Sequence, residues 1–552
     1  MLRLLFQATG ADTTRTKPRS TNRWIVEPRS VDESRLLRVV VIGSGISGII
    51  TSIRFRQRSA NVDLCVYEKN ADIGGTWFEN RYPGCAYIPA HTYQATFEPN
   101  KEWSTFYASA PEIHKYWKRV ADKYDCISHI KLKQEVSEAM WDEQQSKWQL
   151  RIRDVDKGSS YSDQCDVLIS ATGALNNWKW PNIPGLHDFK GKLMHCAAWD
   201  ESYDYSGKKV AVNGNGPSGI QIVPAMLPKV AHLDHYIKGR TWISPTFARY
   251  EIGKRDTDIE NFSFTPEEIE TFKVDHQAYQ RSRKGTPEQI VARKEFLENM
   301  KRRLSKRPEL LDGLVPSFPP ASRRLTPGPG YLEALTDVKV DIISSNIAKV
   351  DANGIITADG THHPTDVIVC ATGFDTTFTP RFPVIGRGGV PLADRWKKTP
   401  ETYLSMMVDG FPNYFISLGP NAALGEGNLL LLVEKAIDYF TQYVQKMQRD
   451  NIQAMRVDKE AVDRFTRHCD QYFSRTVSSA VVGSSLHSLK ALAHPRWEDF
   501  HHEYVNDNPN GWLGDGWTEN EKNQTIHIDY LDDDQIDIPR QLLNPVSVQV
   551  GA

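Results

Sequence analysis

The sequence lacks the features typical of disulfide-stabilised, metal-binding and membrane-spanning proteins. It has seven cysteines among 552 residues, an odd number, and no two of them form a CxxC pair. A disulfide scaffold is therefore not expected, and we predict no metal site and a reducing, cytoplasmic location. No run of about 20 apolar residues is present, so we predict no membrane-spanning helix.

The chain also lacks an excess of charge of either sign. Lysine and arginine together number 67 and the acids number 69, which gives a formal net charge of −2. This balance offers no electrostatic basis for binding nucleic acid or an anionic membrane. No internal repeat of about 20–50 residues is visible, so a solenoid is not expected. The length predicts roughly three to four structural units.

The first 23 residues have a composition of their own. They carry five Lys or Arg residues and a single acid, Asp12. Both a mitochondrial presequence and a flexible arm before the first strand have such a composition. We interpret residues 1–35 as an N-terminal arm.

Two short apolar runs in the sequence each lead directly into a glycine-rich loop. Arg38–Ile42 precedes Gly43–Gly48 (GSGISG), and Lys209–Asn213 precedes Gly214–Gly219 (GNGPSG). A β-branched run followed by GxGxxG and an apolar helical pattern is typical of a buried parallel strand that enters a helix. We therefore predict an α/β fold with two Rossmann-like dinucleotide-binding domains.

The remaining pattern predicts further elements around these two loops. Strands are expected at Val338–Ile343, Gly354–Thr357 and Asp366–Cys370, and an amphipathic helix at Leu429–Met447. Residues 250–322 are rich in charge and poor in strand signals, and Thr265-Pro266-Glu267-Glu268 has the composition of a helix start. We interpret 250–322 as a helical insertion in the second dinucleotide domain.

Each glycine loop has the composition of a pyrophosphate site. Glycines let the backbone approach the phosphates, and the helix N-terminus offers free N–H groups and a positive dipole end. Glu68 follows Gly48 by 20 residues, where an acid accepts hydrogen bonds from ribose hydroxyls. After the second loop the matching region instead ends in Lys238 and Arg240, which suits the 2′-phosphate of NADP. A surface role for Arg240 is the alternative.

Two dinucleotide sites in one chain indicate a tightly held flavin, FAD, used together with a mobile nicotinamide, NADPH. A reduced flavin can pass electrons to a disulfide or to O2. Because the chain has no CxxC pair, we predict O2 as the acceptor and a small organic molecule as the other substrate. The FAD-binding domain is predicted at 36–185 and 372–552, including a C-terminal tail, and the NADP-binding domain at 186–371.

A more specific pattern lies between the two glycine loops. Residues Phe189–Asp200 read FKGKLMHCAAWD, and Phe189, Gly191, His195, Trp199 and Asp200 occupy its defining positions. The segment resembles the FxGxxxHxxxW(P/D) fingerprint of class B flavin-dependent monooxygenases of the Baeyer–Villiger type.

Other segments extend this resemblance over about residues 36–505, with fungal-type members the most similar. They are Gly74–Trp77 with Arg81–Gly84, the paired hinge motifs Ala171–Gly173 and Ala371–Asp375, and Arg323–Tyr331.

The resemblance implies roles for single positions. Arg324 matches the arginine that holds the oxygenated flavin and the nicotinamide, in keeping with the fixed charge of a guanidinium. Arg240 and Arg323 match contacts to the 2′-phosphate, while His195 and Trp199 would organise the interdomain linker. The implied reaction inserts one oxygen atom from O2, above all by converting a bulky ketone to an ester or lactone in secondary metabolism.

The candidate residues follow from these motifs. The catalytic candidates are Arg324, Tyr87 and Asp375. The candidates for contact with FAD or NADPH are Gly43, Ser44, Gly45, Gly48, Glu68, Lys69, Gly75, Thr76, Trp77, Tyr82, Gly214, Gly216, Ser218, Gly219, Arg240, Thr241, Arg323, Thr372 and Gly373. We expect a monomer or a weak homodimer.

One position departs from the family pattern. An Asp normally stands four residues after the glycine of the Pro-Gly pair, but here that residue is Ile88, with Tyr87 beside it. Arg324 would then lack its usual partner, and an unpaired buried charge is costly. With a tyrosine there, hydroxylation, epoxidation or heteroatom oxidation through a flavin hydroperoxide is the alternative to the ketone reaction. A repurposed flavoprotein that cyclises or isomerises its substrate is a further alternative, as is a shifted loop with full activity.

Overall fold

The structure, a computed structural model, describes residues 26, 28–86, 88–105, 107–245, 286–320, 322, 326–422, 429–475, 492–515 and 517–523. Three predicted site residues, Tyr87, Arg323 and Arg324, lie outside the described residues, as does the predicted helix start at Thr265.

A five-stranded parallel sheet carries the first glycine loop. Its strands, in spatial order, are β17 (Tyr414–Ile416), β7 (Val167–Ser170), β1 (Leu37–Ile42), β2 (Val62–Tyr67) and β3 (Ile130–Lys131). Every neighbouring pair is parallel. All four residues of β7 are buried, as expected for a strand of a parallel sheet that is covered on both faces.

A second five-stranded parallel sheet carries the second glycine loop. Its order is β11 (Val340–Ile343), β10 (His232–Tyr236), β9 (Lys209–Asn213), β15 (Val367–Cys370) and β8 (Lys192–His195). In both sheets the strand before the glycine loop lies between the next strand of the chain and the strand before an Ala-Thr-Gly motif. The predicted α/β fold with two Rossmann-like units is therefore confirmed.

An antiparallel sheet is inserted at the same point of each unit. Between β3 and β7 the chain forms β4 (Gln134–Asp142), β5 (Lys147–Asp154) and β6 (Ser160–Cys165), to which β16 (Val384–Ile385) is added. Between β11 and β15 it forms β12 (Ile347–Val350), β13 (Gly354–Thr357) and β14 (His362–Pro364). A two-stranded ribbon of β18 (Ile452–Val457) and β19 (Phe500–Tyr504) completes the described sheets.

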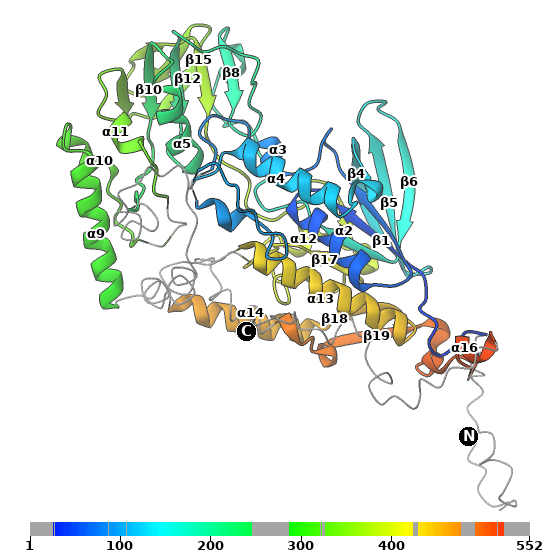
Figure 1. The fold of residues 1–552 in the computed structure, drawn as a ribbon. Helices are drawn as coiled ribbons and strands as arrows, with labels where there is room; N and C mark the ends of the chain where they lie inside the picture. Colours follow the sequence, from blue (N-terminus) through cyan, green and yellow to red (C-terminus); the bar gives the residue numbers. More distant parts are fainter. Residues whose placement is uncertain are drawn as a thin grey trace, which may run out of the picture.

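Helices pack around both units (Figure 1). The first unit has α2 (Ile46–Arg58), α3 (Thr76–Glu79), α4 (Ala110–Lys123), α12 (Leu392–Arg395), α13 (Leu429–Arg449), α14 (Lys459–Ser474) and α16 (Glu519–Lys522), and the second has α5 (Pro217–Met226), α9 (Pro287–Arg303), α10 (Leu311–Leu314) and α11 (Tyr331–Ala334). In Figure 1, α13 and α14 run beneath the parallel sheet of the first unit, and α9 stands at the side of the second unit. Among the described helices, none combines the length and apolarity needed to span a bilayer.

Most expected elements have nearly the expected bounds. β9 and β13 coincide with the predicted Lys209–Asn213 and Gly354–Thr357, and α13 runs two residues past Met447. The strand predicted from Val338 begins only at Val340, because the chain first makes a turn in which the Val340 N–H donates to the Asp337 carbonyl at 3.1 Å. Val338 in this turn is 97% exposed. Within the predicted insertion, α9 starts at a second Thr-Pro-Glu pattern, where the Thr286 hydroxyl accepts the Gln289 N–H at 3.3 Å.

Candidate functional site: two glycine loops and their linker

The first glycine loop lies over the end of β7. Gly43 has φ +102°, and a Cβ there would come within 2.8 Å of the Ala171 carbonyl oxygen. A Cβ at Gly48 would clash with the Gly43 carbonyl oxygen. The Gly43 N–H donates to the Tyr67 carbonyl at 2.8 Å, and the Ala171 N–H donates to Ile42 at 2.9 Å. Glycine is therefore required at both positions.

The second loop repeats this arrangement at the end of β15. Gly214 has φ +117°, and a Cβ there would clash with the Ala371 carbonyl oxygen. The Gly214 N–H donates to the Tyr236 carbonyl at 3.1 Å, and the Ala371 N–H donates to Asn213 at 2.8 Å. Gly219 packs on Gly214 as closely as Gly48 packs on Gly43. The predicted hinge motifs thus lie directly against the two loops, with Ala171 beside Gly43 and Ala371 beside Gly214.

The space in front of both loops fits a dinucleotide pyrophosphate. Helices α2 and α5 begin after Gly45 and Gly216, with no side-chain cap and no acid in the first turn. A Cβ at Gly216, Gly173 or Gly373 would meet no described atom within 4 Å. Free N–H groups at the positive end of a helix, facing open space, are an anion site. The residues present therefore fit two dinucleotides.

Glu68 lies beneath the first loop at the end of β2, where the sequence predicts a ribose-binding acid. It is 3% exposed. Its Oε2 accepts the Ser44 N–H at 2.8 Å and the Ser44 hydroxyl at 3.0 Å, and its Oε1 accepts the Asn70 N–H at 2.8 Å. Each carboxylate oxygen has more than one lone pair, so Glu68 can shape the loop and still accept from a ribose hydroxyl. Lys69 beside it is paired with Glu79.

The segment before α3 packs directly on the first loop. The Gly74 N–H donates to the Ser44 carbonyl at 3.0 Å, and Gly75, at φ +52°, would bring a Cβ within 2.8 Å of the Gly45 Cα. Thr76 begins α3 beside this contact. Trp77 packs edge-on against Tyr93 with ring centroids 4.7 Å apart. The half-buried Trp77 side chain therefore packs against the hydrophobic core of the first unit, two residues after Gly75, which contacts the loop.

Tyr82, another predicted cofactor contact, forms hydrogen bonds with the second unit through its hydroxyl group. The hydroxyl donates to Gln221 Oε1 of α5 at 2.7 Å and accepts from the Ser218 hydroxyl at 3.4 Å. Ser218 is a predicted residue of the second loop, whereas sequence reasoning did not identify Gln221. An amide in an apolar helix is the only signal that could have drawn attention to it.

Arg240 is exposed shortly after β10, beside the second loop. Among the described residues its hydrogen bond is from Nη1 to the Val315 carbonyl at 3.4 Å, which leaves guanidinium donors for a phosphate. The Asn215 side chain donates to the Gly239 carbonyl at 2.6 Å and so joins the loop to this segment. The Thr241 N–H donates to the Leu314 carbonyl at 3.2 Å.

His195 of the fingerprint is fully buried between two tryptophans. Its ring stacks on Trp178 at 4.4 Å and meets Trp180 edge-on at 5.8 Å. Nδ1 accepts the Ala197 N–H at 3.1 Å, so Nε2 carries the proton and donates to the Thr372 hydroxyl at 3.3 Å. Burial lowers the pKa of His195 to about 4. The imidazole is therefore neutral and joins β8 to the second hinge motif.

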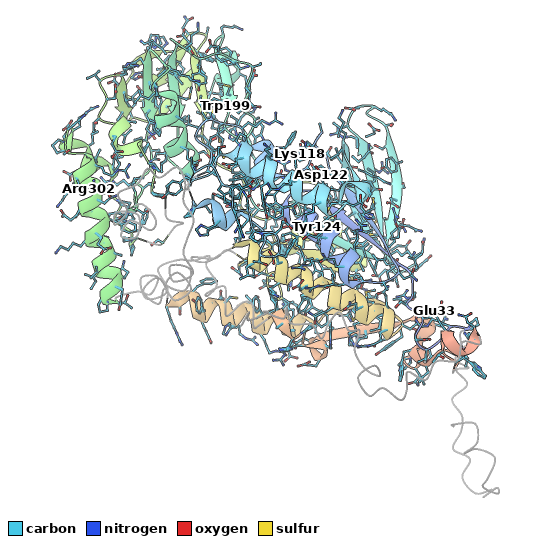
Figure 2. All side chains as sticks on the ribbon, viewed as in Figure 1. Glu33, Lys118, Asp122, Tyr124, Trp199 and Arg302 are labelled. Atoms are coloured by element: carbon cyan, nitrogen blue, oxygen red, sulfur yellow. The ribbon has the colours of Figure 1, made fainter. Side chains whose placement is uncertain are left out.

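The other fingerprint residues also order the linker segment 189–200 through local contacts. A Cβ at Gly191 would come within 2.5 Å of the Phe189 ring, so the ring lies over the glycine. Asp200 forms an ion pair with Lys192 and accepts from Ser202, and these contacts lower its pKa to about 2. Trp199 packs edge-on against Tyr205 at 6.3 Å and lies at the base of the second unit, toward α3 and α4 (Figure 2).

The catalytic candidate Asp375 lies in the second hinge motif. Its N–H donates to the Asn177 carbonyl at 2.6 Å, which joins the two hinge segments. Its Oδ1 accepts the Thr377 N–H at 3.0 Å, and this hydrogen bond lowers the pKa of the carboxyl group. In this structure Asp375 therefore orders the hinge.

The described residues also include one group that could ligate a metal, although the sequence predicted none. His232, Asp234 and Asp341 bring three ligand atoms within 4.8 Å of one another. The group lies toward the amino ends of β10 and β11, whereas the glycine loop follows the carboxyl end of β9. His232 Nε2 is 3.2 Å from each carboxylate, a geometry that an ion pair without a metal also satisfies.

The buried His195 makes the stability of the protein sensitive to acid. Its folded pKa of about 4 lies below the ordinary value of about 6.5, so between these values the unfolded chain binds the extra proton. The contribution of the neutral His195 to the free energy of unfolding is fully present above about pH 6.5 and is lost as the pH falls toward 4. When the pH is lowered from 7.5 to 5, the free energy of unfolding should fall in both proteins. We expect the fall to be about 2 kcal/mol smaller in His195→Asn than in the unmodified protein. Denaturant unfolding at both pH values measures this difference.

His187, which is exposed, provides the control. His187→Asn should keep the acid sensitivity of the unmodified protein. Equal sensitivity in the unmodified protein and His195→Asn would show that His195 is not neutral in the fold.

Comparison with known proteins reveals clear relatives. Residues 36–243 match the sequence pattern of the flavin-binding monooxygenase-like family. An FAD-binding monooxygenase of Aspergillus terreus is 37% identical over 87% of this chain and 91% of its own length. A Baeyer–Villiger monooxygenase of Pseudomonas aeruginosa is 32% identical over 85% and 88%. The crystal structure of cyclohexanone monooxygenase from Rhodococcus sp. Phi1 bound to NADP+ has a TM-score of 0.71 and 26% identity, covering 86% of this chain and all of that one.

Proposed function

The chain belongs to the flavin-binding monooxygenase-like family and is a flavin-dependent monooxygenase, and from this premise we propose that its reaction is the Baeyer–Villiger oxidation of a bulky ketone to an ester or lactone. The observation that carries the proposal is the pair of matching glycine loops, each leading into a helix whose N-terminus has no side-chain cap and no acid in its first turn. Two such loops in one chain suit a flavin and a nicotinamide that react with each other. A role in secondary metabolism is part of the proposal.

The first unit would hold FAD and the second NADPH. The α2 N-terminus would bind the flavin pyrophosphate, and Glu68 would accept from its ribose. The α5 N-terminus would bind the nicotinamide dinucleotide, with Arg240 on its 2′-phosphate. When bound, FAD supplies the centre that accepts a hydride from NADPH and then reacts with O2.

The residues of the chain would position these groups and balance their charge. The His195–Thr372 hydrogen bond and the Asp375–Asn177 contact fix the linker and hinge between the two units. Arg324 would stabilise negative charge that develops during oxygen transfer, because a guanidinium stays charged at every relevant pH. This role comes from the resemblance alone, since Arg324 lies outside the described residues.

The altered loop at Tyr87–Ile88 favours a second candidate function. Ala86, just before it, has φ +106°, which is strained for a residue with a side chain. Strained backbone often gathers at functional sites, and Ala86 directly precedes the altered position. Without the family's acid beside Arg324, oxygen transfer to a carbon, nitrogen or sulfur centre would replace insertion beside a carbonyl.

Product analysis with isotopic oxygen separates these functions. The full-length protein, loaded with FAD, is given NADPH, ¹⁸O₂ and one of three probes: cyclohexanone, a polycyclic ketone or an alkyl aryl thioether. A lactone with one ¹⁸O atom supports the proposed function, whereas a sulfoxide or alcohol alone supports the second candidate. No NADPH oxidation with any probe contradicts both, and product formation without O2 supports a cyclase or isomerase.

Arg240 should determine the preference for NADPH over NADH. A charge-assisted hydrogen bond to phosphate contributes about 1.5–3 kcal/mol, so Arg240→Ala should raise the KM for NADPH roughly 10- to 100-fold. NADH lacks the 2′-phosphate, so its KM should stay nearly constant. Steady-state rates of NADPH and NADH oxidation measure the ratio. Arg151→Ala, which removes an exposed arginine of β5, is the control, and an unchanged ratio in Arg240→Ala would exclude the role.

A further inference from the structure

We propose that the hydrogen bond between Tyr82 and Gln221, named here the 82–221 contact, is a positioning contact that sets the second glycine loop relative to the first. The proposal rests on the proposed function, because it assigns the two loops to FAD and NADPH. Tyr82 acts here through α5 and touches no reacting atom.

One end of the 82–221 contact is fixed to the first loop. Gly74 donates to the Ser44 carbonyl, and Gly75 packs on Gly45, so the backbone before α3 lies against the loop itself. Helix α3 then occupies Thr76–Glu79. Only two residues separate the end of α3 from Tyr82. The position of Tyr82 therefore follows that of the first loop.

The segment that carries Tyr82 lies on α5. Gly84 has φ +78°, and a Cβ there would come within 2.6 Å of the Gln221 carbonyl oxygen and 3.1 Å of the Ala225 Cβ. Such a close approach of backbone to helix requires glycine. Tyr82 is 8% exposed and belongs to the core of the second unit, although its segment comes from the first. Arg81 adds an exposed ion pair with Glu201 at 3.2 Å.

The hydrogen bond itself is short and shielded from water. The Tyr82 hydroxyl donates to Gln221 Oε1 at 2.7 Å, and Gln221 is 8% exposed. Burial raises the pKa of Tyr82 far above its ordinary value, so the hydroxyl stays protonated and remains a donor. Ser218, which donates to the same hydroxyl at 3.4 Å, belongs to the second glycine loop. The contact therefore reaches the loop that would bind NADPH and the first turns of its helix.

A shift of α5 along the Tyr82 segment would break this bond inside an apolar core. A buried polar group that loses its partner is destabilising, so the bond opposes the shift. Hydride transfer is sensitive to such shifts, because reacting atoms must approach to about 3–3.5 Å and a displacement of about 1 Å can cost roughly a hundredfold in rate. The 82–221 contact therefore limits the distance between the flavin and the nicotinamide.

The test is the rate of flavin reduction by NADPH in the FAD-loaded, full-length protein without O2. Tyr82→Phe keeps the ring and removes the hydroxyl, and Gln221→Met keeps the length of the side chain and removes the acceptor. We expect each variant to retain FAD and to lose about tenfold or more in the limiting reduction rate, with a smaller change in the NADPH concentration needed for half-saturation. The double variant should lose no more than either single one.

Tyr116→Phe is the matched control. The Tyr116 hydroxyl is also buried and donates to the Glu98 carbonyl at 2.6 Å, but this bond lies within the first unit. Its loss should change the reduction rate less than about twofold, because it leaves the distance between the two loops unchanged. Thermal unfolding of each variant shows whether it is folded, and Gln221→Met carries the test if Tyr82→Phe does not fold.

The remaining outcomes contradict either the positioning role or the proposed function. If the unmodified protein is reduced and Tyr82→Phe or Gln221→Met is reduced as fast as Tyr116→Phe, the positioning role is wrong. Effects that multiply in the double variant would also exclude it, because the two groups would then act independently. An unmodified, FAD-loaded protein that NADPH does not reduce would contradict the proposed function itself.

Discussion

Gly45→Asp should give a folded protein that is purified without FAD and does not oxidise NADPH. Gly45 has φ −68° and ψ −170°, which any residue adopts, and a Cβ there would be 3.5 Å from the Gly75 Cα, an ordinary contact. Aspartate is also a good N-cap, so α2 should not be weakened. The new carboxylate would, however, occupy the predicted pyrophosphate site and compete for its N–H groups. At about 5 Å and an effective dielectric constant of about 20, two like charges repel by roughly 3 kcal/mol.

This repulsion corresponds to an affinity for FAD lowered by more than about a hundredfold. Flavin absorbance per protein measures the retained FAD, and thermal unfolding without added flavin shows whether the fold survives. Gly45→Asn has the same size without the charge and should retain more FAD. If the Asp and Asn variants retain equal amounts of FAD, a negative charge at Gly45 does not weaken binding, and the pyrophosphate does not lie at this position.

The parts of the fold that the sequence predicts are those set by local patterns. β9 follows from a β-branched run that ends in glycines, and α13 from an apolar stripe with helical spacing. The glycines themselves show where the backbone needs positive φ, as at Gly43 and Gly214. These signals lie within a few residues of one another, so they can be interpreted without knowing the rest of the chain.

Contacts between distant segments could not be predicted in this way. Nothing near Gly43 in the sequence indicates that the Ala171 carbonyl will be its neighbour, since that contact depends on β7 lying beside β1. Tyr82 was predicted to contact the cofactor from its place in a motif, yet its hydroxyl bonds to Gln221 of the other unit. Side-chain direction depends on tertiary packing, which a motif does not encode.

The fingerprint shows the same limit at a single residue. Its spacing identified His195, but the neutral state of the ring depends on burial against Trp178 and Trp180. Two tryptophans shortly before the fingerprint were a visible signal that sequence reasoning did not use. The catalytic roles of Arg324 and Tyr87 remain predictions, because both lie outside the described residues.

Gly216→Asp should give the reverse result to Gly45→Asp, with FAD retained and NADPH binding lost. Gly216 has φ −73° and ψ −177°, and a Cβ there would meet no described atom within 4 Å, so the side chain can be accommodated. Its carboxylate would stand at the N-terminus of α5, where the second pyrophosphate is expected. A repulsion of roughly 3 kcal/mol should raise the KM for NADPH by about a hundredfold or more.

Anaerobic flavin reduction at increasing NADPH concentration measures this loss, and reduction by dithionite should stay normal because the flavin site is unchanged. Gly216→Asn is the uncharged control and should bind NADPH more tightly than the Asp variant. Together the two aspartate variants assign each nucleotide to its loop, since each places the same charge at the same position of a repeated fold. Loss of FAD from Gly216→Asp, with FAD retained by Gly45→Asp, would mean that the two units have been assigned in the wrong order. Loss of FAD from both would mean that the loops do not bind their nucleotides independently.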